Sequence, residues 1–305
     1  MCWDMCKIQR QTRWSWELAR WVSSPDNPLT ARVLVNRVWQ AHFGEGLVGT
    51  PNNFGKLGDR PTHPELLDWL ATEFIRSGWS IKTMHRLMMN SAVYQRASSL
   101  PADQGAQALL VLKRDPDNQR LARYIPRRLE AECVRDAMLA ASGRLDLRSG
   151  GPAGPNFDGR RRSLYVQTPR WTRAYFSTLF DAADPDQTIG KRNVTAVAPQ
   201  AMFFLNHPFV RSQAEALARR VWVDSADGSS RPEQQRGRVP ADGLPPHLSA
   251  RLTRAYRLLF SRTPTAEETA VAADFLYGGQ SRNEQAAWAD LIQILLSTNE
   301  FCYVD

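Results

Sequence analysis

The segment from 44 to 95 constrains the fold most strongly, because a glycine-rich loop runs there directly into two consecutive helical patterns. The loop carries Gly44, Gly46, Gly49, Gly55 and Gly58. Thr62 and Glu65 then have the spacing of a capping box, in which each side chain bonds the backbone amide of the other residue. Apolar residues recur at helical spacing over 66–74 and again over 81–94. The segment therefore predicts an antiparallel helical hairpin behind a long loop.

The rest of the chain also follows a mainly helical pattern. Further helices are predicted near 14–22, 28–43, 126–143, 198–221, 248–260, 265–277 and 281–298. A short strand is predicted at 163–168, where Leu164 and Val166 alternate with more polar residues. We expect a mainly α fold, a multi-helical globular domain with a small β element and long loops.

Composition divides the chain into three parts. Residues 13–222 are expected to form the main helical domain, which contains the glycine-rich loop at 44–61 and the β element near 163–168. Residues 223–247 are rich in Ser, Gly, Pro, Gln and Arg and have almost no apolar side chains, which predicts a disordered linker. Residues 248–305 are expected to form a three-helix segment that packs on the main domain.

The net charge of +8 comes from 39 basic and 31 acidic residues, and nearly all the basic residues are arginine. Arginine favours planar, bidentate partners such as carboxylate, phosphate or sulfate. The excess is dispersed, with Arg160–Arg162 as the only tight cluster, and no zinc-finger spacing or RNA-recognition signature accompanies it. A solvated structural arginine face is therefore favoured over nucleic-acid binding, which stays open as an alternative.

Metal and cofactor chemistry finds little support in the sequence. The four cysteines form no disulfide framework, zinc knuckle or haem-attachment motif, and Cys133 is expected in the core. Asp181, Asp184 and Asp186 form an acidic run that lacks the glycine and the final glutamate of an EF-hand loop, so a solvated turn is favoured over a calcium site. We therefore expect no metal site and no cofactor in this chain.

Membrane and export signals are also missing from the sequence as written. No run approaches the roughly 20 apolar residues of a membrane span. Charged residues interrupt the first 25 residues, so they contain no apolar core of a signal peptide. On this ground alone, the chain is expected to be cytoplasmic.

Polar residues of the glycine-rich loop are the leading candidates for ligand binding. A loop that ends at a helix N-terminus can hold an anion, because free amides and the helix dipole point the same way there. Asp59, Arg60 and His63 would line such a site, whereas the structural alternative is that they tie the loop to the domain surface. Asn193 and His207 are further candidates in loops. The catalytic residues are unknown, because the five histidines form no metalloprotease helix and no recognisable triad.

Several longer segments together carry a family resemblance. They are Ser24-Pro-Asp-Asn-Pro-Leu29, Val35-Asn-Arg-Val-Trp39, Leu57-Gly-Asp-Arg-Pro-Thr-His-Pro-Glu-Leu-Leu67, Arg127-Arg-Leu-Glu-Ala-Glu132, Asn193-Val-Thr195 with Pro199-Gln-Ala201, and Ser297-Thr-Asn-Glu-Phe301. From roughly Trp16 to Asp305 the chain resembles the planctomycete-specific domain of unknown function found C-terminal to a cytochrome-c-like domain. The resemblance implies longer, secreted or envelope-associated relatives with a haem-binding module and a second uncharacterised domain upstream.

The chain also departs from that pattern. Met1 to Thr12 does not resemble the family, and the haem motif, the preceding domain and the secretion signal are missing. We therefore expect a fragment of a longer protein, in which haem would bind only in an upstream domain. The resemblance implies a secreted, periplasmic or envelope location.

These observations favour an uncharacterised, non-catalytic binding or assembly module of a cell-envelope, cytochrome-associated protein that takes part in polysaccharide handling. Its expected partner is an anionic polysaccharide or an envelope protein. One alternative is a hydrolase that acts on complex carbohydrate through loop carboxylates and His63. The second alternative is a nucleic-acid binder. Without a catalytic motif, enzyme activity of the isolated chain is the less favoured interpretation.

Overall fold

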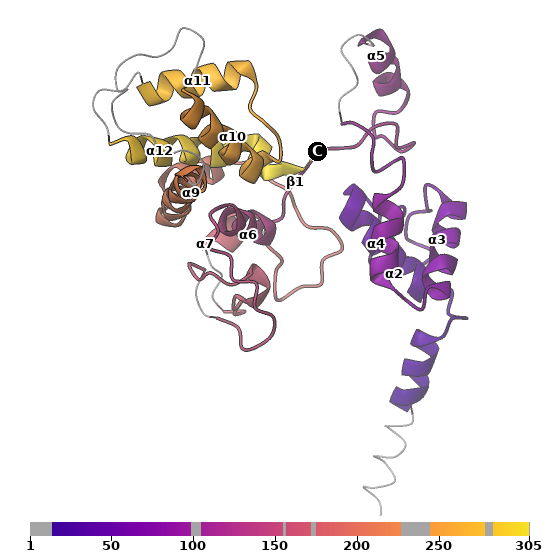
Figure 1. Cartoon of the computed structure of the whole chain (residues 1–305). Helices are drawn as coiled ribbons and strands as arrows, with labels where there is room; N and C mark the ends of the chain where they lie inside the picture. Colours follow the sequence, from indigo (N-terminus) through magenta and orange to yellow (C-terminus); the bar gives the residue numbers. More distant parts are fainter. Residues whose placement is uncertain are drawn as a thin grey trace, which may run out of the picture. The chain divides into compact units, whose positions relative to one another are not determined.

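The computed structural model describes residues 14–98, 105–154, 157–171, 175–226, 245–277 and 283–304. These residues fold mainly into α-helices, as their periodicity predicts, and include a sheet of two short strands. The chain divides into two compact units, drawn in Figure 1. Unit 1 comprises the residues up to Arg127 together with Ile189–Lys191, and unit 2 comprises Arg128–Thr188 and Arg192–Val304.

Unit 1 is built around helix α2, which contacts both α3 and α4 (Figure 1). Its helices are α2 (Thr30–Phe43), α3 (Pro64–Arg76), α4 (Ile81–Met89) and α5 (Gly105–Arg114), and residues 14–23 are also helical. Each helix of the bundle turns an apolar stripe inward: Val35 on α2, Leu70 and Phe74 on α3, and Met84 and Met88 on α4 are at most 2% exposed. Burial of each such side chain contributes about 1.5–3 kcal/mol, so this cluster holds the three helices together.

Local sequence signals locate the turn of the helical hairpin correctly. Ser80 precedes α4 and caps it, since its Oγ accepts a hydrogen bond from Thr83 N at 3.3 Å. Gly78 has a φ of 69°, the left-handed conformation that commonly follows a helix end. The chain therefore leaves α3 and enters α4 within a few residues.

The capping box predicted at the start of α3 is wrong. Helix α3 starts at Pro64, with His63 in the N-cap position and no side-chain cap hydrogen bond among the described residues. Proline at the first helical position fixes φ there and needs no amide partner, so the helix begins one residue later than the box requires. The predicted cap Thr62 instead donates through its N and Oγ1 to Leu47 O, at 2.8 and 3.3 Å. Thr62 therefore ties the two ends of the glycine-rich loop together.

Unit 2 is a second helical bundle, in which α9 and α12 share the most extensive contact. Strand β1 (Arg127–Arg128) spans the boundary between the units. The other elements of unit 2 are α6 (Ala131–Ala141), the 3-10 helix η2 (Ser163–Tyr165), α7 (Tyr175–Leu179), α8 (Ala198–Asn206), α9 (Pro208–Ala226), α10 (Pro246–Phe260), α11 (Ala266–Tyr277), α12 (Glu284–Leu296), α13 (Asn299–Cys302) and β2 (Tyr303–Val304). Leu217, Leu252, Trp288 and Ile292 are at most 1% exposed in its core.

The first and last residues of unit 2 lie side by side. Strands β1 and β2 form the two-stranded sheet, and Leu129 N donates to Cys302 O at 2.7 Å. Phe301 and Cys302 are buried in the core of the unit. The C-terminal segment is therefore anchored at the point where unit 2 begins.

The strand predicted at 163–168 is not a strand. Residues 163–165 form the 3-10 helix η2, and Val166 makes an isolated parallel bridge. Ser163 N and Oγ both donate to Asp136 Oδ1, at 2.7 and 2.8 Å, which turns the chain at this point. Strand pairing in the described residues lies instead in β1 and β2.

The division between the units differs from the division expected from composition. Residues 13–222, expected as one domain, span the boundary at Arg127 and Arg128. Of the expected linker 223–247, residues 227–244 lie outside the described residues, and α9 and α10 occupy its two ends. Helices α10 and α12 of the C-terminal segment contact α9.

Two other local predictions in unit 2 have opposite outcomes. The capping box at Thr265 and Glu268 is confirmed: Thr265 N donates to the Glu268 carboxylate at 2.7 Å, and Glu268 N donates to Thr265 Oγ1 at 3.2 Å. The box predicted at Ser281 lies outside the described residues. The core position predicted for Cys133 is wrong, because α6 turns Val134 and Met138 inward and leaves Cys133 exposed.

Candidate functional site

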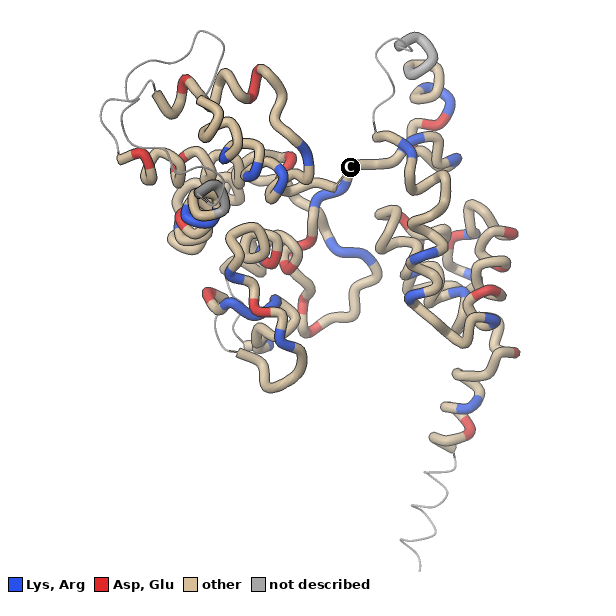
Figure 2. The backbone as a smooth tube through the Cα atoms, viewed as in Figure 1, with Lys and Arg blue, Asp and Glu red and all other residues tan. Residues whose placement is uncertain are grey.

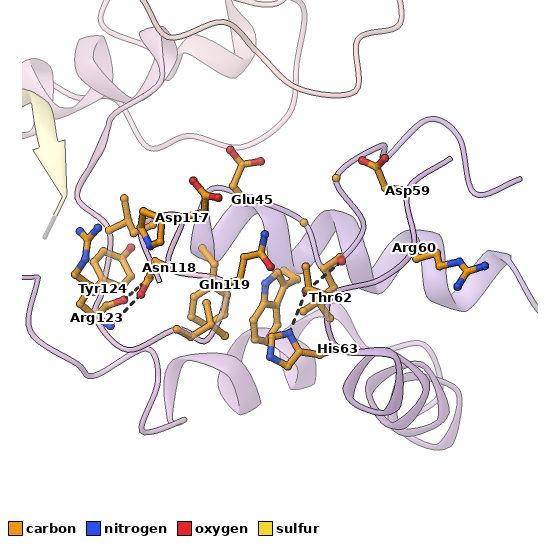
Figure 3. A pocket seen from close by; sticks show the side chains of 18 residues that line it. Glu45, Asp59, Arg60, Thr62, His63, Asp117, Asn118, Gln119, Arg123 and Tyr124 are labelled. Carbon is orange, nitrogen blue, oxygen red and sulfur yellow. Dashed lines mark hydrogen bonds between the residues drawn. The ribbon is translucent and has the colours of Figure 1, made fainter. Parts of the chain in front are cut away.

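A pocket of about 620 Å³ lies in unit 1. Three segments line it: the C-terminal half of α2, the glycine-rich loop, and residues 116–125 after α5 (Figure 3). Ligand sites commonly have volumes of about 300–1,000 Å³ and combine apolar walls with a few polar groups. The size of this pocket therefore suits a small molecule or part of a polymer.

Aromatic side chains form one wall of the pocket. Trp39 and Phe43 lie one turn apart on α2, and their ring centroids are 4.0 Å apart. Tyr124 is 4% exposed, and its hydroxyl donates to His42 O at 3.3 Å. Tyr94 meets both Phe43 and Tyr124 edge to face, at centroid distances of 5.9 and 5.6 Å. These contacts make the wall a packed, preformed surface.

Asn36 fixes the start of the glycine-rich loop from inside the core. It is 0% exposed, its Nδ2 donates to Val48 O at 3.1 Å, and its Oδ1 accepts from Val48 N at 2.9 Å. Gly46 lies directly against this amide, since a Cβ at Gly46 would be 2.7 Å from Asn36 Nδ2. Because the side chain satisfies both backbone groups of Val48, the loop is held against α2.

The middle of the same loop folds back on itself. Thr50 Oγ1 donates to Asn53 O and accepts from Asp59 N, both at 2.9 Å. Gly58 permits this closure, because a Cβ there would lie 1.9 Å from Asn53 O. The Asp59 carboxylate lies against Gly49, where an added Cβ would be 2.8 Å from Asp59 Oδ2. The loop therefore sets Asp59 at the edge of the pocket.

A second loop, residues 115–125, is also held by internal hydrogen bonds and lines the pocket with the glycine-rich loop. The sequence analysis did not predict it. Asn118 is 4% exposed with a φ of 52°, and its side chain bonds Arg123 O at 2.8 Å and Arg123 N at 3.3 Å. The Asp115 carboxylate accepts from Gln119 N and Arg120 N, both at 2.8 Å. Asp and Asn close turns in this way and tolerate the left-handed conformation, so the Asp-Pro-Asp-Asn run carried a usable signal.

Polar groups of both charges surround the aromatic wall. The carboxylates lining the pocket belong to Glu45, Asp59 and Asp117, and the guanidinium groups belong to Arg60 and Arg123. In Figure 3, Asp59 and Arg60 lie toward one end of the pocket and Arg123 lies toward the other. The pocket therefore offers hydrogen-bond donors and acceptors along its length.

Three of the five candidate ligand-binding residues come together in this pocket. Asp59, Arg60 and His63 all line it. His63 Nδ1 lies 3.0 Å from Thr62 Oγ1, whereas the exposed side chain of Arg60 points away from the other labelled groups in Figure 3. The end of the glycine-rich loop and the N-cap of α3 thus contribute all three residues to the pocket lining, although the Arg60 guanidinium points away from the other labelled groups.

Asn193 and His207 belong to unit 2 and do not line this pocket. Asn193 is exposed in the segment before α8. His207 is half-buried; its Nδ1 accepts from Phe209 N at 3.2 Å, and its ring stacks on Phe203 with centroids 4.3 Å apart. His207 therefore joins α8 to α9.

A histidine pair lies behind the aromatic wall. His42 Nε2 and His85 Nδ1 are 2.7 Å apart, which requires one nitrogen to donate and the other to accept. Burial lowers the pKa of His42, and the charges of His85 and Arg127 lower it further. The neutral form of His42 is therefore favoured in the folded unit.

The acidic run of unit 2 supports a structural role for Asp181. Its carboxylate accepts from Arg128 Nη2 and from Thr195 N and Oγ1, each at 2.9 Å. Burial alone would raise the pKa of Asp181, but these hydrogen bonds outweigh burial and lower it. Within the described ranges, no group of three or more His, Cys, Asp and Glu side chains could hold a metal ion.

Fold and site together define a mainly helical protein of two units with a candidate ligand-binding pocket in unit 1. The family model PSD1, described as a protein of unknown function (DUF1553), matches residues 15–276, so the chain belongs to this family. No curated protein and no solved structure matches the chain. None of the helices in the described part of the chain combines the length and the apolar character needed to cross a lipid bilayer.

Proposed function

We propose that the chain is a non-catalytic carbohydrate-binding module and that its unit 1 pocket holds sugar residues of a polysaccharide. The observation that carries this proposal is an aromatic wall and a polar rim in one pocket of about 620 Å³. A sugar ring has an apolar face of C–H groups, which suits an aromatic surface, and a periphery of hydroxyls, which suits carboxylates, amides and guanidinium groups. Both kinds of partner are present here.

Preorganisation of the pocket supports the same conclusion. Asn36 and Asn118 each bond both the N–H and the C=O of one residue in a lining loop, and both side chains are at most 4% exposed. A ligand that enters a preformed site does not have to order these loops, so more of its contact free energy appears as affinity. A preformed site favours sugar binding, because each hydrogen bond to a sugar hydroxyl contributes little free energy and little can be spent on ordering the loops.

An acidic sugar is the favoured ligand. Arg60 and Arg123, which lie toward opposite ends of the pocket in Figure 3, can each bind a carboxylate or sulfate group through two parallel hydrogen bonds, and His63 is a further lining residue. Glu45, Asp59 and Asp117 would accept from hydroxyls. We also propose an envelope location and an association with a cytochrome-containing protein, as the family resemblance implies.

Isothermal titration of the full chain with an acidic oligosaccharide, oligogalacturonate, and a neutral one, cello-oligosaccharide, tests the proposal. The double variant Arg60→Ala, His63→Ala should weaken binding by about tenfold or more, equal to about 1.4 kcal/mol. The control Lys82→Ala, Arg86→Ala removes two exposed basic side chains of α4 that do not line the pocket, and it should bind normally.

Two results would contradict different parts of the proposal. Full affinity in the Arg60→Ala, His63→Ala variant would show that the ligand binds elsewhere. No heat of binding with any oligosaccharide would show that the module does not bind these carbohydrates.

A carbohydrate hydrolase is a second candidate, favoured by the three carboxylates that line one pocket. Glycoside hydrolysis needs two facing carboxyl groups, one of them as a general acid. The hydrolase predicts new reducing ends from the same oligosaccharides, lost in Asp59→Asn at unchanged Tm. Absence of reducing ends from the unmodified chain would exclude it for these substrates.

Nucleic-acid binding remains the third candidate. Figure 2 shows Lys and Arg positions spread along both units, without a single continuous stripe in either. This candidate predicts an affinity for duplex or single-stranded DNA that falls steeply with salt. A filter-binding assay at low salt that retains no DNA would remove it.

A further inference from the structure

Another pocket, of about 210 Å³, lies within unit 2. Its lining comes from the first half of α6, from residues 157–168 around η2, and from α7 with the turn that follows it. An apolar cavity of about 150 Å³ is large enough to hold benzene. The pocket in unit 2 therefore has room for one ring, or a short alkyl chain, that carries a small polar group.

Two aromatic side chains supply much of the apolar lining. The rings of Phe157 and Phe176 have centroids 4.6 Å apart, and Phe176 is 5% exposed. Val166 and Ala182 add aliphatic surface to the same lining. Transfer of a hydrocarbon group from water onto such a surface is favourable. The pocket therefore suits a ligand with an apolar body.

The buried Arg135 holds one wall of this pocket in place. Its side chain is 2% exposed, and its donors bond three carbonyl oxygens of the loop before η2: Phe157 O at 2.8 Å, Gly159 O at 2.6 Å and Arg161 O at 2.9 Å. Its charge is paired with the Asp136 carboxylate at 3.3 Å. The wall is therefore formed before a ligand arrives, and this guanidinium is already engaged and does not act as an anion site.

Glu132 is the acidic group of the lining. Its Oε2 accepts from Arg192 Nη1 at 2.6 Å, whereas Oε1 makes no hydrogen bond to a residue that the structure describes. The Glu130 carboxylate lies 3.2 Å from the same guanidinium nitrogen. Two carboxylates thus share one guanidinium, which leaves a negative charge at this edge of the pocket. Partial burial raises the pKa of the adjacent Cys133 thiol, and the charges of both glutamates raise it further.

These groups match the chemistry of a protonated amine. An alkylammonium group has three N–H donors and no acceptor. The Glu132 carboxylate, the Ser177 hydroxyl and the Gln167 amide oxygen can all accept hydrogen bonds, and all three residues line the pocket. A hydrogen bond between an ammonium and a carboxylate is among the strong ones, because both partners are charged. Aromatic rings beside the pocket also attract a cation.

We propose that the pocket of unit 2 binds a small primary amine with an apolar body, its ammonium group at Glu132 and its body against Phe157 and Phe176. The site is independent of the unit 1 pocket, because the two share no lining residue. The amine site therefore does not depend on the carbohydrate proposal.

Titration of the full chain with three probes, followed by ligand-observed NMR, tests the site. The probes are phenethylamine, 2-phenylethanol and phenylacetate, which share one ring and differ in the polar group. Glu132 is partly exposed, so solvent screens its charge. We expect phenethylamine to bind about fivefold more tightly than 2-phenylethanol, and phenylacetate to bind no more tightly than the alcohol.

The test variant is Glu132→Gln, and the matched control is Glu130→Gln. Both variants remove one carboxylate from the same guanidinium, and glutamine can still accept from Arg192, but only Glu132 lines the pocket. We expect the preference for the amine over the alcohol to vanish in Glu132→Gln and to persist in Glu130→Gln.

A second variant, Ser177→Leu, tests the position of the apolar body. The larger side chain occupies part of the pocket, so phenethylamine and 2-phenylethanol should both bind about tenfold more weakly. Thermal unfolding of each variant checks that the fold is kept. If Ser177→Leu does not fold, the comparison of the two glutamate variants decides the question.

Three results would overturn the proposal. The first is that none of the three probes binds, or that the amine binds no more tightly than the alcohol. The second is an unchanged preference for the amine in Glu132→Gln. The third is full affinity for phenethylamine in a folded Ser177→Leu variant, which would place the bound amine elsewhere in the chain.

Discussion

Replacing Asn36 with alanine should release the glycine-rich loop of unit 1 from α2. The side chain is 0% exposed and bonds Val48 O and N at 3.1 and 2.9 Å. Its loss leaves a buried carbonyl and a buried amide without these partners, and each such group costs about 1–3 kcal/mol. We therefore expect Asn36→Ala to lower the free energy of unfolding of unit 1 by about 2–5 kcal/mol. A typical total is only about 5–15 kcal/mol.

Asn52 offers a matched control in the same loop. Its Oδ1 accepts from Arg37 Nη2 at 2.7 Å, but this pair is exposed. Water can replace an exposed partner, so Asn52→Ala should change the free energy of unfolding by about 0.5 kcal/mol or less. The comparison separates a buried amide from an exposed one with the same substitution.

Urea denaturation of both variants, followed by hydrogen exchange of peptides from unit 1, measures the effect where it arises. The exchange of peptides from the glycine-rich loop should accelerate most in Asn36→Ala. If the two variants differ by less than about 0.5 kcal/mol, the two bonds to Val48 do not hold the loop, and the reasoning from buried hydrogen bonds is refuted.

Further predictions concern one glycine and two titrating groups. Gly58→Ala would place a methyl group 1.9 Å from a carbonyl oxygen of its own loop. Urea denaturation should therefore show a free energy of unfolding that is lower by about 2 kcal/mol or more. A change near zero would show that the loop can move aside. Hydrogen bonds from Arg262 lower the pKa of Glu268 to about 2, so stability of unit 2 should fall as the pH drops below the usual value of 4.5 toward 2. The pair is mostly solvent-screened, so the loss should be about 1 kcal/mol or less, and Glu268→Gln should remove it from an acid-unfolding curve. An unaltered curve would contradict the assignment. Burial and then His85 lower the pKa of His42, so stability of unit 1 should be fully present above the usual value of 6.5 and decline as the pH falls below it. Thermal unfolding at about pH 7.5 and about pH 5.5 checks this, and an equal decline in His42→Gln would count against it.

Local signals were sufficient for most of the longer helices and for part of the site, but α5 and α7 were not predicted. The positions of Ser80 and Gly78 predicted the turn of the hairpin, because caps depend on a few neighbouring residues. The glycine-rich loop drew attention to Asp59, Arg60 and His63, and these residues do line one pocket. Their contribution to ligand binding stays a prediction.

Features that depend on distant residues could not be predicted. The 3-10 helix at 163–165 follows from hydrogen bonds to Asp136, and an alternating pattern gives no information about that carboxylate. Asn118 was missed because its importance depends on the burial of a loop whose sequence is merely polar. Asn36 was noticed within a motif, but its bonds to Val48 require the packing of α2 against the loop.

The hydrogen bond from Leu129 N to Cys302 O makes unit 2 close to a ring in its connectivity. A short peptide joining the two ends would restrict mainly the unfolded chain, because the folded ends already meet. If the two ends were joined, the chain of unit 2 could start and end at another position without changing which helices pack together. Unit 2 should accordingly tolerate circular permutation, with new termini opened in a surface turn away from the β1–β2 closure.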